Sequence, residues 1–126
     1  MTYIKRDIED KILALSKEYS CILVTGPRQV GKTTALLRLM ADNREYVTLD
    51  DLEERSLAKR DPAMFLQIHS TPIMIDEVQY APELFPYIKM LVDERRQLGE
   101  FWLTGSQLFS MMEGVQESLA GRVALL

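Results

Sequence analysis

Residues 26–33 read GPRQVGKT and directly follow the apolar run CILVT at residues 21–25. The segment matches the pattern G-x-x-x-x-G-K-[ST] at every fixed position. In this pattern the glycines let successive backbone N–H groups surround a phosphate, and the lysine supplies a compact cation. The pattern needs a buried strand before it and a helix after it, and both are expected here. The stretch therefore predicts a phosphate-binding loop (P-loop) in an α/β protein, with an ordinary glycine turn as the alternative.

Each position of this loop has an expected role in holding phosphates. Lys32 is expected to contact the β- and γ-phosphate oxygens, and Thr33 to offer its hydroxyl to Mg²⁺. Thr34 is expected to support the adjoining phosphate region. The helix that begins here adds the partial positive charge of its free N–H groups. The predicted nucleotide-binding residues are Gly26, Pro27, Arg28, Gln29, Val30, Gly31, Lys32, Thr33 and Thr34.

A second chemical signal is PIMIDEVQ, at residues 72–79, where a short apolar strand ends in two acids. In P-loop enzymes the first acid of such a pair holds Mg²⁺, and an adjacent glutamate orients or deprotonates the attacking water. Asp76 is therefore predicted to bind Mg²⁺ together with Thr33, and Glu77 to act in catalysis. The alternative is that both acids only cap the following helix. Capping would explain their charge but not their place after so short a buried strand.

Strands and helices alternate along the rest of the chain. Short apolar runs predict five strands, at residues 20–25, 46–49, 72–75, 101–103 and 123–126. Residues at helical spacing predict the intervening helices; Asp50 and Asp51 are expected to provide an N-cap for one, and Gly99 to end another. The alternation implies right-handed crossovers and a parallel sheet between two layers of helices. The predicted fold is a three-layer αβα P-loop NTPase fold.

The glutamate directly after the metal-binding aspartate indicates the division of P-loop proteins that carries an additional strand. The expected sheet order is 5-1-4-3-2, with residues 101–103 inserted between the phosphate-loop strand and the metal-binding strand. The inserted strand would bring a polar group to the γ-phosphate or to the attacking water. Ser106 is the first candidate for this sensor role, followed by Gln107 and Thr104. Thr-Gly-Ser at residues 104–106 is equally common as ordinary turn chemistry.

The composition limits the classes of function. With 126 residues, of which 47% are hydrophobic, the chain has the size and composition of one globular domain. Its net charge of -4 gives no general attraction to nucleic acid or anionic lipid, and no clear basic patch is visible. Residues 1–11 mix charged and apolar residues, so neither a secretory signal nor a membrane anchor is expected. The lone Cys21 suits core packing in a cytoplasmic protein. The lone His69 is expected to be solvated or to cap a helix.

Six segments, taken in order, resemble one known family. GPRQVGKTT, YVTLDD, DP-x-x-FL, MIDEVQ, LTGSQ and SLAGRV are similar to the prokaryotic AAA-type ATP-binding proteins, whose longer members continue into a C-terminal domain of unknown function. The resemblance covers nearly the whole chain. It implies binding of ATP and Mg²⁺ and hydrolysis of ATP through Lys32, Thr33, Asp76 and Glu77, with a sensor near Ser106.

The resemblance also bears on assembly and domain organisation. Arg122 lies where some oligomeric ATPases present an arginine to the γ-phosphate of a neighbour, so Arg122 is a candidate to act in trans in a homo-oligomer; a lone surface arginine is the commoner alternative. The helical lid that normally follows this fold is absent from residues 1–126. The chain is therefore expected to be an N-terminal ATPase core without its lid and C-terminal domain.

Three functions fit these observations. The first is Mg²⁺-dependent ATP binding and hydrolysis that drives or regulates an attached or partner domain. The second is a regulatory nucleotide switch with little turnover. The third is a small P-loop kinase, although neither an acceptor-binding segment nor a basic lid is visible. No guanine-reading N/T-K-x-D segment occurs in the sequence, and the preference for ATP comes from the resemblance.

Overall fold

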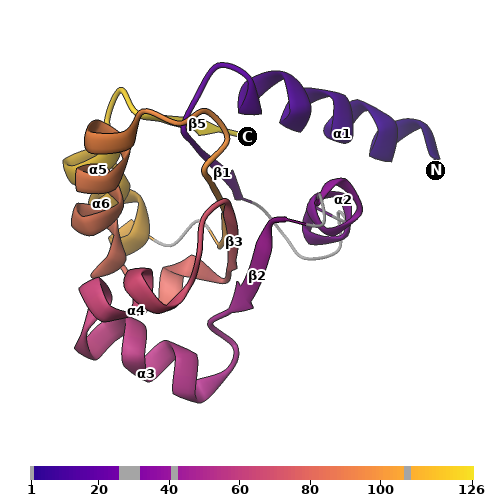
Figure 1. The fold of residues 1–126 in the computed structure, drawn as a ribbon. Helices are drawn as coiled ribbons and strands as arrows, with labels where there is room; N and C mark the ends of the chain where they lie inside the picture. Colours follow the sequence, from indigo (N-terminus) through magenta and orange to yellow (C-terminus); the bar gives the residue numbers. More distant parts are fainter. Residues whose placement is uncertain (1, 26–31, 41–42, 107–108) are drawn as a thin grey trace.

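A computed structural model of the chain describes residues 2–25, 32–40, 43–106 and 109–126 (Figure 1). The side chains of residues 2–7, 32–34 and 109–110 lie outside this description. In chain order the elements are α1 (Thr2–Ser16), β1 (Cys21–Thr25), α2 (Lys32–Leu39), β2 (Glu45–Thr48), α3 (Leu52–Arg60), α4 (Pro62–Ile68), β3 (Ile73–Asp76), the 3-10 helix η2 (Val78–Tyr80), α5 (Leu84–Arg95), β4 (Phe101–Gly105), α6 (Phe109–Leu119) and β5 (Val123–Leu125). None of the described helices is both long enough and apolar enough to cross a bilayer.

The strands form one sheet in the order β2-β3-β4-β1-β5, and every pair of neighbours is parallel. This is the order expected from the sequence, with β4 inserted between β1 and β3. Cys21 at the start of β1 pairs with Phe101 on one side and with Val123 on the other. Since all five strands run the same way, their carboxyl ends lie along one edge of the sheet and their amino ends along the other.

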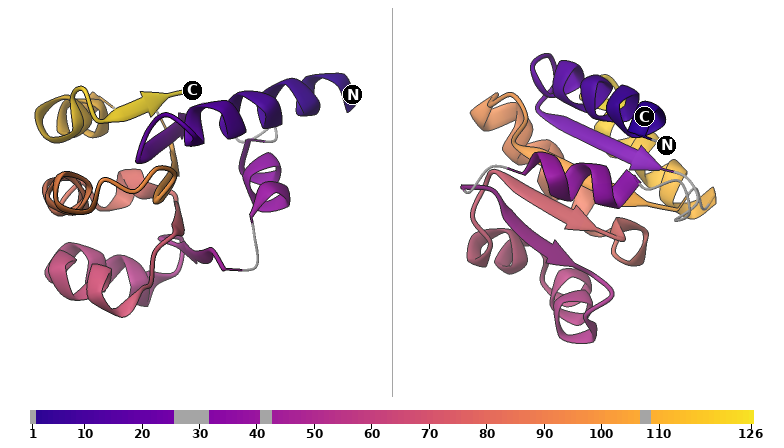
Figure 2. Two further views of the ribbon diagram at one scale, coloured as in Figure 1. Left: turned by 45° about the horizontal axis from the view of Figure 1, so that its top comes forward. Right: turned by 90° about the vertical axis from the view of Figure 1, so that its right-hand side faces the viewer.

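Helices cover both faces of the sheet, which confirms the three-layer architecture (Figure 2). Successive side chains of a strand point to opposite faces, and this alternation divides the core in two. Leu23, Ile75 and Leu103 belong to the larger cluster, which the buried residues of α3, α4, α5 and α6 complete. The strand side chains that point to the opposite face, Met74 and Trp102 among them, pack against α1 and α2. The near-continuous apolar strands of the sequence are thus explained by burial on both faces.

Helix α3 begins as the sequence predicts. Asp51 is its N-cap, and the carboxylate oxygen Oδ1 accepts hydrogen bonds from the backbone N–H groups of Glu53 (2.9 Å) and Glu54 (3.2 Å). These bonds satisfy two of the four N–H groups that the first turn of a helix leaves without an internal partner. The cap therefore fixes the start of α3, shortly after the end of β2.

Gly99 does not end α5, contrary to the expectation from sequence. The helix ends at Arg95, and Arg96 itself adopts the left-handed conformation (φ 52°), with its N–H bonded to the carbonyl of Val92 at 2.9 Å. Gly99 has a positive φ of 71°, which favours glycine, and close packing gives a second reason for glycine here. A Cβ at Gly99 would lie 2.4 Å from Ser16 Oγ, so only glycine lets the chain pass the end of α1.

Candidate functional site

The carboxyl ends of β1, β4 and β3 lie side by side and form the candidate site. Val24 pairs with Thr104, and Thr25 pairs with Gly105, which places the end of β1 directly beside the end of β4. On the other side of β4, strand β3 ends at Asp76. The chain segment that carries the phosphate-loop motif leaves the sheet at Thr25. The topology therefore brings the start of the motif and the predicted carboxylates to the same edge.

Asp76 is nearly buried, with 6% of its surface exposed, and two hydroxyl groups hold its carboxylate. Thr104 Oγ1 donates to Oδ1, and the Tyr46 hydroxyl donates to Oδ2 at 2.9 Å. Burial, together with this bond to a carboxylate, raises the pKa of Tyr46 to about 12. Taking a carboxylate out of water is costly unless hydrogen bonds replace the lost hydration. The two hydroxyls therefore fix the orientation of Asp76 without neutralising its charge.

Glu77 is 8% exposed and adopts an unusual backbone conformation, with φ 61° and ψ 47°. A residue other than glycine in this left-handed region costs on the order of 1 kcal/mol, so the surroundings must stabilise it. Its N–H donates to Thr104 Oγ1 at 3.1 Å, and its Oε1 accepts from Gln79 Nε2 at 2.7 Å. Glu77 makes no side-chain capping bond to η2, so helix capping does not account for its position. The Thr104 hydroxyl thus bonds both to the carboxylate of Asp76 and to the backbone N–H of Glu77.

The loop after β4 reaches the same place. Ser106 is exposed, and its N–H donates to Gln79 Oε1 at 3.2 Å. Thr104, the third sensor candidate, is 4% exposed and uses its hydroxyl to hold the two acids. Gln107 lies outside the described residues. The structure thus brings Thr104 and Ser106 to the carboxylates, and their roles toward a nucleotide remain predictions.

Two further residues at this edge, Tyr46 and Gln79, were not among the sequence candidates. Gln79 lies two positions after Glu77 inside MIDEVQ, so its closeness to Glu77 in the chain could have indicated this contact. Tyr46 precedes Asp76 by 30 residues, and only the strand register reveals the contact. Tyr46 pairs with Met74, and Asp76, two residues further along β3, presents its side chain to the same face as Met74.

The phosphate-loop residues themselves fall largely outside the description. This applies to the predicted binding residues Gly26, Pro27, Arg28, Gln29, Val30 and Gly31, and to the side chains of Lys32, Thr33 and Thr34. What the structure does describe is the context that the motif requires. The fully buried strand β1 precedes the loop, and the backbone of α2 begins at Lys32. The roles of the nine residues remain predictions.

Arg122 lies at the opposite edge of the sheet from Asp76, because it directly precedes the amino end of β5. Its Nε donates to Asp93 Oδ1 on α5 at 2.6 Å, and its Nη1 donates to the carbonyl of Ala120 at 3.2 Å. The hydrogen-bonded ion pair lowers the pKa of Asp93 and raises the pKa of Arg122. Arg122 is therefore not brought to the carboxylates of its own chain, and a role in trans remains a prediction.

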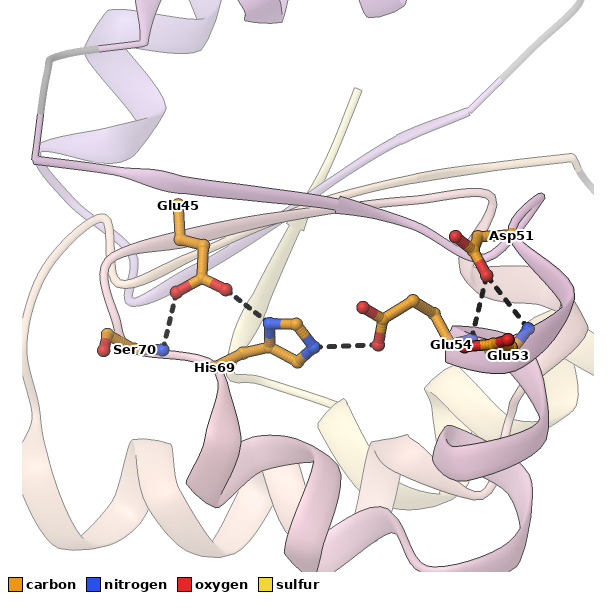
Figure 3. Close-up of polar contacts among 6 residues, drawn as sticks. All are labelled: Glu45, Asp51, Glu53, Glu54, His69 and Ser70. Atoms are coloured by element: carbon orange, nitrogen blue, oxygen red, sulfur yellow. Dashed lines mark hydrogen bonds and ion pairs between the residues drawn. The ribbon is translucent and has the colours of Figure 1, made fainter.

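A second polar cluster surrounds His69, the residue that follows α4 (Figure 3). The side chain is 10% exposed, so it is not solvated. The backbone N–H of His69 does cap α4 by donating to the carbonyl of Phe65. Its Nδ1 bonds to Glu45 Oε2 and its Nε2 to Glu54 Oε1 at 2.9 Å. Carboxylates only accept hydrogen bonds, so both ring nitrogens donate and the ring is an imidazolium. The cluster ties β2 to α3 and α4.

The pKa values of this cluster follow from its geometry. Burial opposes the charged ring of His69, but the hydrogen bonds to Glu45 and Glu54 outweigh burial and raise its pKa. Burial alone would raise the pKa of Glu45, whereas the bonds from His69 and from the N–H of Ser70 lower it. Within the described part of the chain, no group of three or more His, Cys, Asp or Glu residues is arranged to hold a metal ion. The cluster is an ion-pair network.

The order of the parallel sheet and the buried acid pair beside the strand that leads into GPRQVGKT define a P-loop NTPase. Comparison with known families agrees with this class. A model described as "AAA domain" matches residues 18–126, and the chain belongs to that family.

Two curated relatives are similar over almost the whole chain. They are uncharacterized proteins of Mycobacterium bovis and Mycobacterium tuberculosis, each 37% identical over 125 residues. The alignments cover 97% of this chain but only 28% of each relative. The comparison therefore relates the chain to one part of considerably longer proteins.

Proposed function

We propose that this chain is an ATP-binding core that hydrolyses ATP in the presence of Mg²⁺. The observation that carries the proposal is the buried pair Asp76–Glu77 at the edge where the phosphate-loop motif begins, with the Thr104 hydroxyl bonded to the Asp76 carboxylate and to the Glu77 backbone N–H. A structural role alone gives no reason to place two adjacent acids in a nearly buried position and to stabilise one of them in a left-handed conformation. Membership of the AAA domain family supports ATP as the nucleotide.

The residues at this edge fit a magnesium site by their chemistry. Mg²⁺ prefers hard oxygen ligands and retains several waters, and Asp76 offers an oriented carboxylate whose two hydroxyl partners leave its charge intact. In the proposal Asp76 and Thr33 hold the ion, which supplies positive charge next to the transferred phosphoryl group. Lys32 contacts the β- and γ-phosphates, and residues 26–34 surround them with backbone N–H groups.

Two residues at the carboxyl edge have proposed roles in the reaction. Glu77 orients the attacking water and accepts its proton, and Ser106 contacts the γ-phosphate. Arg122 is proposed to act on the nucleotide of a neighbouring subunit in a homo-oligomer. Because the chain spans 28% of the length of its relatives, we also propose that the cycle drives or regulates an attached or partner domain in the cytoplasm.

One observation favours a second candidate, a nucleotide switch with little turnover. The Glu77 carboxylate is bonded to Gln79, so it is already engaged by a side chain of its own segment. A general base must reach the proton that it removes. If this bond persisted in the ATP complex, Glu77 would contact water poorly and hydrolysis would be slow.

Two variants of the full-length protein test the proposal. Lys32→Ala removes the cation that faces the phosphates and is expected to abolish ATP binding in isothermal titration calorimetry. Lys59→Ala is the matched control, because Lys59 is an exposed lysine paired with Glu83 at 3.3 Å on the surface. Unchanged ATP affinity in Lys32→Ala would refute the binding site.

The second variant separates hydrolysis from switching. Glu77→Gln keeps the size of the side chain but removes its basicity, and phosphate release is expected to fall by about 10²- to 10⁴-fold with ATP binding retained. Glu113→Gln on α6, an exposed glutamate, is the control. If the wild type bound ATP but released phosphate no faster than Glu77→Gln, the switch would be the correct assignment.

A further inference from the structure

Gln79 connects two parts of the candidate site that are separate in the sequence. Its Nε2 donates to Glu77 Oε1 at 2.7 Å, and its Oε1 accepts the N–H of Ser106 at 3.2 Å. A carboxylate can only accept and a backbone N–H can only donate, so a single orientation of the amide satisfies both partners. Among uncharged side chains of this length, only glutamine supplies the donor and the acceptor together.

Gly105 provides independent support for a specific fit. A Cβ at Gly105 would lie 2.8 Å from Gln79 Oε1 and 3.2 Å from Met111 Sδ, closer than side chains normally approach. Gly105 does not have the positive φ that would require glycine for backbone reasons. The missing side chain at the end of β4 therefore leaves the space into which the amide of Gln79 extends.

We propose that Gln79 is a positioning residue that holds the Glu77 carboxylate and couples it to the loop carrying Ser106. The proposal rests on the proposed ATPase function, and it adds the means by which the γ-phosphate would control Glu77. A phosphate that engages the Ser106 segment moves the N–H bonded to Gln79 Oε1. The amide then shifts with its acceptor, and its Nε2 changes the orientation of Glu77. Glu77 is thereby aligned only when a triphosphate is bound.

The left-handed backbone at Glu77 makes this control effective. With φ 61°, the main chain turns sharply between the end of β3 and η2, and the N–H of Glu77 is fixed to Thr104. The backbone is therefore anchored, and the remaining freedom of Glu77 is in its side-chain torsions. Gln79, two residues later, acts on that freedom directly through the 2.7 Å bond.

Gln79→Leu and Gln79→Glu test the proposal in the full-length protein. Leucine removes both hydrogen bonds, whereas glutamate keeps an acceptor for Ser106 but places a second carboxylate against Glu77. Both variants are expected to lower kcat for phosphate release at least about 10-fold, while the Kd for ATP from a fluorescence titration changes less than about 2-fold. Gln116→Leu, on the exposed side of α6, is the matched control and is expected to match the wild type.

Gly105→Ala is a second variant that leaves Gln79 and Glu77 in place. Its methyl group would displace the Gln79 amide, so kcat is expected to fall with unchanged ATP affinity. This variant keeps the test decisive if a substitution at Gln79 prevents folding. A merely structural role would instead lower the melting temperature and the ATP affinity together with kcat.

The outcomes separate this inference from the function on which it rests. A wild type that neither binds nor hydrolyses ATP would overturn the proposed function. A wild type that hydrolyses ATP, with Gln79→Leu equally active, would overturn only the role of Gln79. Full activity in Gln79→Glu would also overturn it, because the donor to Glu77 would then be dispensable.

Discussion

Replacing Thr104 with valine removes one hydroxyl group and leaves the volume of the side chain nearly unchanged. Thr104 is 4% exposed, and its hydroxyl donates to Asp76 and accepts the N–H of Glu77 at 3.1 Å. A hydrogen bond to a charged group contributes roughly 1.5–3 kcal/mol, and a buried N–H without a partner costs roughly 1–3 kcal/mol. Because the two losses overlap, we expect Thr104→Val to lower the free energy of unfolding by about 3 kcal/mol.

Equilibrium unfolding in urea, without nucleotide, measures this loss. The slope of the unfolding free energy against urea is about 1–3 kcal/mol per molar for small proteins, so the midpoint should fall by roughly 1–3 M. Thr104→Ser is the matched control, because serine keeps the hydroxyl and loses only a methyl group, at about 1 kcal/mol. The valine variant should therefore be less stable than the serine variant. The opposite order would refute the role assigned to the hydroxyl and indicate that Thr104 matters mainly through apolar packing.

Two other residues give predictions of a different kind. The folded-state pKa of His69 is raised above its ordinary 6.5, so its ion pairs with Glu45 and Glu54 contribute fully below pH 6.5 and are lost as pH rises through the raised value. The pKa of Glu45 is lowered, so the contribution of Glu45 to stability is present above pH 4.5. The difference in unfolding free energy between wild type and His69→Gln, measured in urea, should therefore be largest near pH 5.5 and shrink by pH 9. A difference that does not depend on pH would contradict the charged network. Tyr46→Phe removes a hydroxyl that orients Asp76. The Mg²⁺ concentration for half-maximal phosphate release should therefore rise about 10-fold or more. An unchanged Mg²⁺ dependence would mean that Tyr46 does not support the carboxylate proposed to bind the metal.

The features that the sequence itself predicted share a local origin. The phosphate-loop motif, the adjacent acids of MIDEVQ and the cap at Asp51 each depend on residues close together in the chain. The sheet order was also predicted, because alternating strands and helices imply a parallel sheet and the glutamate after Asp76 indicates the division of P-loop proteins with an additional strand. The role of Gly99 was mistaken, since the expectation took account of helix termination but not of the approach to Ser16.

Contacts between distant segments could not be predicted in the same way. His69 has no charged neighbour in the sequence, yet folding brings Glu45 and Glu54 to its two ring nitrogens. The partner of Arg122, Asp93, likewise lies on another helix. Such pairings depend on strand register and on how helices pack over a sheet, and a shift of one residue in register would turn the side chains of a strand to its other face.

The sequence by itself determined the class of this protein, because the phosphate-loop motif and the strands of a parallel sheet each consist of neighbouring residues. The tertiary structure alone decided how the predicted acids are held. Thr104 bridges Asp76 and Glu77, Tyr46 reaches Asp76 from the edge strand, and Gln79 joins Glu77 to the loop after β4. Hydrogen bonds form only at short distances and in fixed directions, and the fold brings the donors and acceptors of separate strands within that range.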